Sequence, residues 1–385
     1  MIKDCIIMAG GSGTRLWPAS SSKNPKQFLP LSPEASFFDS AVERALGICG
    51  EAGDGRVIII AGKTHIPRII ESCALLSEDK RKRLLLIPEP AAKSTAPAIA
   101  CAVSYAGLAW GKDRNMLVLT SDHIIRPAAL FYAGAARALD FAARGNLAVF
   151  GIPPRGPETG YGYIEAAEPL SLPGEQPPLD RAAPGGKVYR AASFREKPSR
   201  DQAEKYLAAG GFYWNSGMFA FSVPFILEEF RHGAPDIIRP FESLKAPGEA
   251  AYRTEGGLRI LEEWPGLERA YGEAAPISFD YAIAEKCGST VMVAAGFDWI
   301  DVGSWDEYAK LKTGAAPEVY LSASSDCFVD ADIPVALCGV EDLIIAVRSG
   351  RDGNPPAVLV AKRGKTQMVK EIVEQIKAAG RTELL

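Results

Sequence analysis

The chain has 385 residues, of which 47% are hydrophobic and 23% charged, and its formal net charge is -4 at pH 7. These values are ordinary for a soluble globular protein, and the length allows two domains and one large core. The slight negative charge gives no electrostatic reason to expect nucleic acid or an anionic membrane as a partner, so local cations must meet any anionic ligand.

Cysteine and histidine usage narrows the class further. Seven cysteines are scattered along the chain without a C-x-x-C pair, and there are only three histidines. This pattern argues against a disulfide framework and against a zinc cluster. No uninterrupted apolar run approaches the length that spans a bilayer. We therefore expect a cytoplasmic protein in a reducing compartment.

Strand-like and helix-like stretches alternate over the first 150 residues. Buried strands are predicted over residues 6–8, 57–61, 84–87, 116–120 and 147–151. Helices are predicted over residues 36–49, 66–76, 95–110 and 127–143. The alternation predicts an α/β fold in which a mostly parallel sheet is covered by helices on both faces, with ligands at the carboxyl ends of the strands.

The pattern changes after residue 151. Two strands, residues 160–165 and 187–194, flank a loop rich in Pro, Gly and Ala that we expect to be exposed, mobile and without chemistry. Further strands are predicted over residues 218–222 and 290–294.

A small β-rich region closes the chain. Beyond a linker near Gly314, β-type runs cover residues 327–329, 335–338, 343–347 and 357–360, and a helix is predicted over residues 366–379. An apolar stripe on that helix is interpreted as core packing. We predict two domains, residues 1–315 and a C-terminal β-rich domain, residues 316–385.

The first strand leads into a glycine-rich loop with the sequence AGGSGTR at residues 9–15. Its backbone N–H groups have little side-chain cover, which suits a polyphosphate. Arg15 adds a planar fork for phosphate oxygens, and Lys26 adds a compact charge after Pro25. Neither the Walker A pattern nor the dinucleotide fingerprint fits, because Arg15 and Leu16 occupy the deciding positions. A simple strand-to-helix turn explains the glycines less well than a phosphate site.

Two aspartates are candidate magnesium ligands. Asp122 follows the strand over residues 116–120, where an α/β sheet gathers its ligands, although it could equally cap a turn. Ser304 and Glu307 have capping-box spacing, so Ser304 can begin the following helix. Asp301 is left without an evident structural role.

Several polar residues between these aspartates suit a hexose phosphate. Glu196, Asn215 and the backbone of Gly160 can bind hydroxyl groups, and Lys197 can bind a phosphate. Taken singly, each is explained as well by a strand exit or a turn. Asp280 either contacts the sugar or caps a helix over residues 281–286.

A family resemblance rests on GGSGTRLWP at residues 10–18 and PKQFL at residues 25–29. These motifs resemble the signature of sugar-phosphate nucleotidyltransferases, and the Leu-Trp-Pro and Lys-Gln-Phe details resemble the mannose-1-phosphate guanylyltransferase branch. The resemblance implies the nucleotidyltransferase fold, with a short left-handed β-helix-like C-terminal unit. It also implies a homodimer and a chain without the isomerase domain of bifunctional relatives.

The activity that the resemblance implies is GMP transfer from GTP to α-D-mannose 1-phosphate. The products are GDP-mannose and pyrophosphate, and the attack on the α-phosphorus is in line and Mg²⁺-dependent. Asp122 and Asp301 would hold the Mg²⁺, and Arg15 and Lys26 would act with them as catalytic residues.

The resemblance also assigns binding residues. The nucleotide would be bound by Gly10, Gly11, Gly13, Thr14, Arg15, Lys26, Glu89, Thr95 and Ser121. The sugar phosphate would be bound by Gly160, Glu196, Lys197, Asn215 and Asp280. Glu89 could accept from guanine N1–H and the 2-amino group. Two departures from the family pattern are Ser94, where asparagine is usual, and Thr120, where proline or alanine is usual.

Two alternatives remain open. One is the same chemistry on another pair, such as dTTP with glucose 1-phosphate. The other is a non-catalytic regulator that binds a nucleotide sugar. A regulator predicts damaged metal or phosphate residues, whereas Arg15, Lys26, Asp122, Lys197 and Asp301 are all present.

Overall fold

The computed structural model describes residues 2–11, 13–22, 24–32, 34–50, 54–172, 185–312, 318–350 and 355–385. The chain divides into two compact units. Unit 1 comprises Met1–Gly10 and Ala41–Ile300, and unit 2 comprises Gly11–Ser40 and Asp301–Leu385. The linker predicted near Gly314 and most of the predicted Pro-rich loop lie outside the described residues. The domain boundary between residues 315 and 316 stays a prediction.

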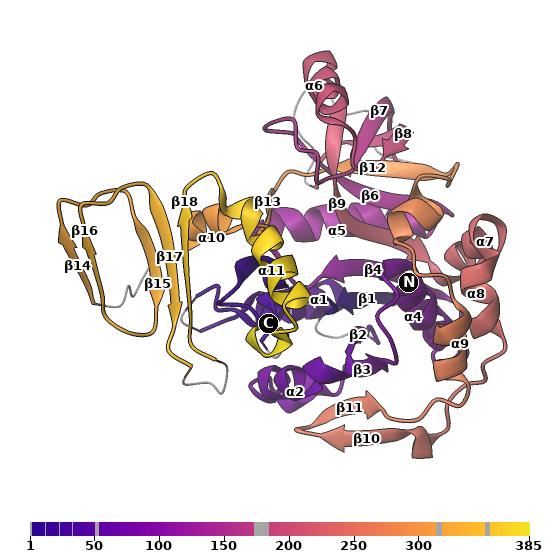
Figure 1. Cartoon of the computed structure of the whole chain (residues 1–385). Helices are drawn as coiled ribbons and strands as arrows, with labels where there is room; N and C mark the ends of the chain where they lie inside the picture. The colour runs from indigo at the N-terminus through magenta and orange to yellow at the C-terminus, as the bar shows by residue number, and fades with distance from the viewer. Residues whose placement is uncertain are drawn as a thin grey trace. The chain divides into compact units, whose positions relative to one another are not determined.

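Unit 1 contains an eleven-stranded sheet in the order β10-β11-β3-β2-β1-β4-β9-β6-β12-β8-β7 (Figure 1). Its parallel centre consists of β3 (Leu84–Glu89), β2 (Val57–Gly62), β1 (Ile2–Met8) and β4 (Arg114–Thr120). Met8 pairs with both Ile60 and Thr120, and Gly62 pairs with Glu89. The four strands therefore end at one edge of the sheet, where an α/β fold gathers its ligands.

The remaining strands of the sheet are β6 (Leu147–Ile152), β7 (Tyr163–Leu170), β8 (Val188–Arg195), β9 (Phe212–Ser222), β10 (Tyr252–Glu255), β11 (Leu258–Leu261) and β12 (Thr290–Ala294). A separate pair joins β5 (His123–Arg126) to β13 (Asp298–Asp301). The strand predicted from Gly160 begins instead at Tyr163. The ring of Tyr161 packs against Trp214 and Trp299, so the residues before Tyr163 turn instead of extending the strand.

Helices cover both faces of the sheet, as predicted. They are α1 (Phe37–Cys49), α2 (Ile66–Ala74), α3 (Glu78–Arg81), α4 (Thr95–Ala109), α5 (Ala128–Ala142), α6 (Arg200–Ala209), α7 (Val223–Gly233), α8 (Pro235–Glu242) and α9 (Leu267–Glu273). Successive residues of β1 serve opposite faces, because Ile6 joins the core around α4 whereas Cys5 Sγ contacts Ala45 O of α1. This arrangement confirms the predicted α/β fold.

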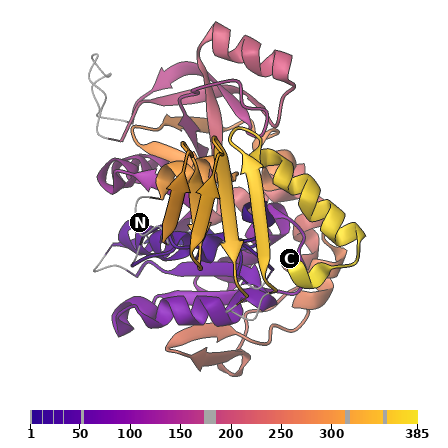
Figure 2. The same cartoon turned by 60° about the vertical axis from the view of Figure 1, so that its left-hand side comes forward.

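Unit 2 contains the turns η1 (Thr14–Leu16) and η2 (Lys26–Phe28), the helices α10 (Trp305–Leu311) and α11 (Val369–Ala378), and the strands β14 (Val319–Ser322), β15 (Phe328–Ala331), β16 (Val335–Cys338), β17 (Leu343–Arg348) and β18 (Ala357–Lys362). β14 pairs in parallel with β16 and β15 pairs in parallel with β17, and β18 lies antiparallel beside β17 (Figure 2). Parallel pairing between strands two apart in sequence is typical of the coils of a β-helix. Its left-handedness stays a prediction.

The apolar stripe of α11 is only partly buried. Val369 and Val373 are 3% and 2% exposed, whereas Met368 and Ile372 are exposed. The predicted core packing therefore holds for one half of the stripe. No helix in the described ranges has the length and the apolar surface that crossing a bilayer requires.

Candidate active site

The glycine loop enters unit 2 and approaches the backbone of Lys26. Gly13 has a φ of +58°, and a Cβ added to it would lie 2.5 Å from Lys26 N. Any side chain would clash there, so the close approach requires glycine. Ser20 Oγ donates to Gly13 O at 2.6 Å and fixes the turn that carries Thr14 and Arg15.

Lys26 and Asp301 form an ion pair within unit 2. Lys26 Nζ lies 3.0 Å from Asp301 Oδ1, and the two side chains are 7% and 24% exposed. Asp301 therefore has a partner that sequence reasoning did not identify. A Cβ added to Gly303 would lie 3.7 Å from Arg15 Nη1 and 3.9 Å from Asp301 O. Arg15 and Lys26, the cations predicted to bind phosphate, thus lie close to Asp301, a predicted metal ligand.

Helix α10 begins directly after this group. Ser304 Oγ accepts from Glu307 N at 3.4 Å, which confirms the predicted N-cap. Glu307 Oε2 accepts from Gly303 N at 2.7 Å, and burial raises the pKa of the Glu307 carboxyl. Glu307 therefore fixes the backbone beside Asp301. Sequence reasoning gave it only a capping role.

The same loop is tied to the end of the described chain. Trp17 Nε1 donates to Leu384 O at 2.7 Å, and Trp305 Nε1 donates to Trp17 O at 2.9 Å. Ser22 Oγ donates to Leu385 O at 2.5 Å. These hydrogen bonds join the loop, α10 and the last residues into one support for Arg15 and Lys26.

In unit 1, Gly10 and Glu89 meet at the carboxyl ends of β1 and β3. A Cβ added to Gly10 would lie 3.3 Å from Glu89 Oε2, and Tyr271 Oη donates to Glu89 Oε1 at 3.5 Å. Burial raises the pKa of Glu89 to about 7. His65 Nδ1 lies 3.1 Å from Ala9 O and must donate to it, because the carbonyl only accepts. The carboxyl group of Glu89 thus changes charge near neutral pH beside the glycine backbone.

Thr95 and Ser121 lie at the same edge of the sheet. Thr95 Oγ1 accepts from Phe279 N at 2.8 Å, so this hydroxyl supports the segment before Asp280. Ser121 is buried, and its N–H donates to Met8 O at 3.3 Å. Their predicted nucleotide contacts stay predictions.

His123, which sequence reasoning left without a role, lies close to Asp122. Trp299 Nε1 donates to His123 Nδ1 at 3.1 Å, so the neutral imidazole carries its proton on Nε2. That nitrogen lies 3.8 Å from Asp122 Oδ1. The Asp122 side chain remains 34% exposed and accessible to a ligand. Asp122 belongs to unit 1 and Asp301 to unit 2, so a shared Mg²⁺ stays a prediction.

Four predicted sugar-phosphate residues gather in unit 1. Lys197 Nζ lies 2.6 Å from Glu196 Oε1, and Asn215 Nδ2 donates to Asp280 Oδ1 at 2.7 Å. Burial raises the pKa of both Glu196 and Asp280, and the charge of Asp280 raises that of Glu196 further. The capping alternative for Asp280 is wrong. Its side chain is bound to Asn215, and the turn that it begins is a short π-helical one, residues Asp280–Ala284.

The second oxygen of Glu196 is the most unusual atom of this group. Glu196 Oε2 is shielded from solvent and has no hydrogen-bond partner among the described residues. A Cβ added to Gly162 would lie 2.4 Å from it. Glu285, which sequence reasoning missed, accepts from Glu196 N at 2.8 Å. Gly160, predicted to contact the sugar, is exposed and has no atom within 4 Å of an added Cβ, and its sugar contact stays a prediction.

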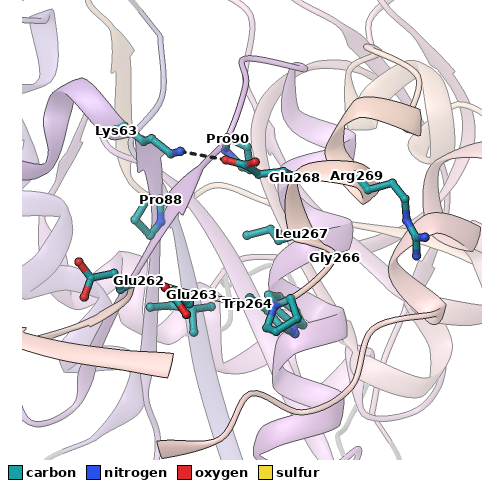
Figure 3. Close-up of a pocket in the computed structure, with 12 residues that line it drawn as sticks. Lys63, Pro88, Pro90, Glu262, Glu263, Trp264, Gly266, Leu267, Glu268 and Arg269 are labelled. Carbon is teal, nitrogen blue, oxygen red and sulfur yellow. Dashed lines mark hydrogen bonds and ion pairs between the residues drawn. The ribbon is translucent and has the colours of Figure 1, made fainter. Parts of the chain in front are cut away.

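A cavity of about 570 Å³ opens in unit 1 beside Pro88 and Pro90, the residues on either side of Glu89 (Figure 3). Lys63 Nζ and Glu268 Oε1 lie 3.3 Å apart on its wall. The volume is within the range of small-molecule sites. The cavity therefore lies at the end of β3, and Glu89 itself is not among its lining residues.

The described residues contain no group of three or more His, Cys, Asp or Glu side chains that could hold a metal ion. A site for Mg²⁺ does not need one, because this ion usually takes one or two carboxylates and fills its other positions with water and phosphate oxygens.

Comparison with known proteins places these features in context. A family model described as nucleotidyl transferase matches residues 4–316. The chain is 36% identical over 388 residues to the mannose-1-phosphate guanylyltransferase of Klebsiella pneumoniae, covering 98% of this chain and 74% of the relative. It is 36% identical over 385 residues to the Escherichia coli protein of the same name, with the same coverage.

A solved structure is also similar along the whole chain. It is the crystal structure of mannose-1-phosphate geranyltransferase from Thermus thermophilus, with a TM-score of 0.75 and 27% sequence identity. The match covers 98% of this chain and 100% of that one.

Proposed function

Because the chain belongs to the nucleotidyl transferase family and its mannose-1-phosphate guanylyltransferase branch, we propose that it transfers GMP from GTP to α-D-mannose 1-phosphate. The products are GDP-mannose and pyrophosphate. The observation that carries the proposal is the group formed by Arg15, Lys26 and Asp301 beside the glycine loop. This group offers two cations and backbone N–H groups to a triphosphate.

The proposed reaction depends mainly on how the two substrates are positioned. A phosphate oxygen of mannose 1-phosphate attacks the α-phosphorus in line, and pyrophosphate leaves on the opposite side. A phosphate monoester is already ionised at neutral pH, so the step needs little general-base help. Arg15 and Lys26 neutralise charge on the triphosphate, and the hydrogen bonds around the loop hold the backbone that carries Arg15 in place before substrate binds.

Asp122 and Asp301 fit the requirements of Mg²⁺. Both offer hard carboxylate oxygens, and their side chains are 34% and 24% exposed, so each can be reached by an ion. Lys26 Nζ also contacts Asp301 Oδ1, which places a phosphate-binding cation beside this carboxylate. When bound, Mg²⁺ would neutralise charge on the triphosphate and the leaving pyrophosphate.

In unit 1, mannose 1-phosphate and the guanine base of GTP bind to different residues. Glu196, Asn215 and Asp280 bind mannose hydroxyls, and Lys197 binds the sugar's phosphate. Glu196 Oε2 supports this assignment, because a sugar hydroxyl would supply the donor that it lacks. Ionised Glu89 accepts from the N1–H and 2-amino groups of guanine.

The assembly and location are also proposed. Exposed apolar side chains on β14 and β18 support a homodimer, among them Tyr320, Leu321, Val358 and Val360. Sedimentation of the purified chain would test the dimer. All seven cysteines are free thiols, which supports the cytoplasm as the location.

A pyrophosphorolysis screen tests the function against its alternatives. The purified chain would be incubated with Mg²⁺, pyrophosphate and GDP-mannose, ADP-, UDP- and dTDP-sugars in parallel. We expect release of GTP from GDP-mannose to be fastest. Faster release of dTTP from dTDP-glucose would favour the other nucleotidyltransferase, and binding of GDP-mannose without turnover would favour the regulator.

A further inference from the structure

A second cavity, of about 350 Å³, opens at the other end of the parallel strands of unit 1. β2 and β3 begin beside it and end at Gly62 and Glu89. Six residues of β3 span about 17 Å at a rise of about 3.3 Å per residue, so the cavity is well separated from Glu89. The lining residues used below are Arg56, Lys82, Arg83, Trp110, Tyr252 and Arg259.

The lining is strongly basic. It has four cations and one carboxylate, Glu249, and one of the cations, Lys82, also pairs with Glu78 at 2.7 Å. Among the residues that the structure describes, neither Arg56 nor Arg83 has a carboxylate partner. Arg83 Nε donates to Gly55 O at 3.0 Å, whereas its Nη2 is shielded from solvent and has no hydrogen-bond partner within the described part of the chain. A buried donor of this kind is stabilised by an acceptor from a ligand.

Aromatic rings hold two of the arginines in place. Arg56 Cζ lies 5.3 Å from the centre of the Trp110 ring, and Arg259 Cζ lies 3.8 Å from the centre of the Tyr252 ring. A guanidinium stacked on a ring keeps its N–H edges available for hydrogen bonds. Because these side chains are already ordered, an anion that binds them loses little conformational entropy.

The remaining partner of Arg259 is weak. Arg259 Nη2 lies 3.0 and 2.9 Å from the two carboxylate oxygens of Glu249, whose side chain is 89% exposed. Exposed ion pairs contribute little free energy, so a more highly charged ligand can replace Glu249.

We propose that this cavity is a second anion site that binds a small polyphosphate, apart from the candidate active site. Planar guanidinium forks match phosphate oxygens in pairs. Lys82 pairs with Glu78 and Arg259 with Glu249, which leaves Arg56 and Arg83 without a carboxylate partner among the described residues. The volume admits a small molecule. The proposal goes beyond the proposed transferase reaction and does not depend on it.

Calorimetric titration of the full chain with sodium pyrophosphate, without divalent metal, tests the site. The double variant Arg56→Ala/Arg259→Ala removes two exposed arginines. We expect its affinity at one pyrophosphate site to fall at least about tenfold. Arg253→Ala is the matched control, because Arg253 lies on the same hairpin but pairs with Glu255 and Glu262 outside the cavity. Equal isotherms for the wild type and the double variant would overturn the proposal.

Fluorescence gives a second measurement that does not depend on the alanine variants. Pyrophosphate near Arg56 should change the emission of Trp110, and Trp110→Phe should remove that change. Arg56→Lys and Arg259→Lys keep the charge but lose the fork, so we expect intermediate affinities from them. A fluorescence change that persists in Trp110→Phe and vanishes in Arg15→Ala would assign all binding to the glycine loop and would overturn the second site. Synthesis of GDP-mannose is assayed separately and reports only on the proposed function.

Discussion

The candidate phosphate-binding residues of unit 2 and the candidate sugar-binding residues of unit 1 differ in their charge. Around the glycine loop, the cations Arg15 and Lys26 equal in number the carboxyl groups of Asp301 and Glu307. In unit 1, the carboxyl groups of Glu196 and Asp280 outnumber the single cation of Lys197. The difference agrees with the proposed ligands, since phosphates need cations and N–H donors whereas hydroxyls need acceptors.

The two groups also differ in how completely their polar atoms are satisfied. Lys26 has its partner within 3.0 Å, and Ser304 and Glu307 fix the backbone next to Asp301. Glu196 Oε2 is shielded and without a partner among the described residues. We therefore expect the residues around Lys26 to change little when a substrate binds, and Glu196 to gain a hydrogen bond.

Removal of Arg15, a cation proposed to bind phosphate, should have the largest effect on activity. Arg15→Ala removes a fork from the transition state, and we expect kcat for GDP-mannose synthesis to fall about 10²–10³-fold. Arg68→Ala is the control, because Arg68 is an exposed arginine paired with Glu71 in α2. Its kcat should match the wild type. Near-normal synthesis by Arg15→Ala would end the assignment of catalysis to the loop.

Substitution of Glu196, one of the candidate sugar-binding residues, should lower the affinity for substrate instead of kcat. Glu196→Gln keeps the shape of the side chain but removes a charged acceptor, so we expect KM for mannose 1-phosphate to rise about 10-fold or more. KM for GTP should stay unchanged, because the proposed contacts assign the two substrates to different residues. Steady-state kinetics with each substrate varied separately measures both. An equal rise in both KM values would contradict the assignment of Glu196 to mannose 1-phosphate alone.

Glu89 should make nucleotide affinity depend on pH. Its pKa is raised by burial to about 7, and only the ionised carboxylate accepts from the guanine edge. KM for GTP should therefore rise about 10-fold as pH falls from 8 to 6. Glu89→Gln should have a high KM that does not change over this range, whereas Glu196→Gln should keep the wild-type pH profile for GTP.

The same pKa predicts an opposite trend in stability. Between its ordinary value of 4.5 and about 7, Glu89 binds more protons in the folded chain than in the unfolded one. Its contribution to the free energy of unfolding therefore falls as pH rises through this window. Urea unfolding of the wild type and Glu89→Gln at pH 5 and pH 8 would measure the difference. A gap that does not change with pH would contradict the raised pKa.

Local patterns made most of the unit 1 sheet and the glycine loop predictable. Buried parallel strands are continuous apolar runs, and the clustered glycines mark a turn whatever surrounds them. The strands β10 and β11 were not predicted, because each has only four residues and carries charged side chains. Short polar hairpins have a weak signal in a single sequence.

Tertiary contacts explain the site residues that were missed. Glu285 accepts from Glu196 N across 89 positions of sequence, and Trp299 donates to His123 across 176. The grouping of residues 11–40 with the C-terminal region depends on hydrogen bonds such as Trp305 Nε1 to Trp17 O, across 288 positions of sequence. Such contacts leave no periodic pattern, so only a structure can identify them.

The smallest predicted effect concerns the N-cap of α10. It tests whether this cap helps to hold Arg15 and Lys26 in place or only stabilises the fold. Ser304 and Ser199 are both helix N-caps, with Oγ accepting from Glu307 N and Gln202 N respectively. Replacing either by alanine should cost about 1 kcal/mol of unfolding free energy, measured by urea denaturation. Only Ser304→Ala should also lower kcat, by a few fold, because its helix begins beside Asp301. A similar fall in kcat for Ser199→Ala would mean that activity follows stability, and that the cap beside Asp301 has no special part in holding the phosphate cations.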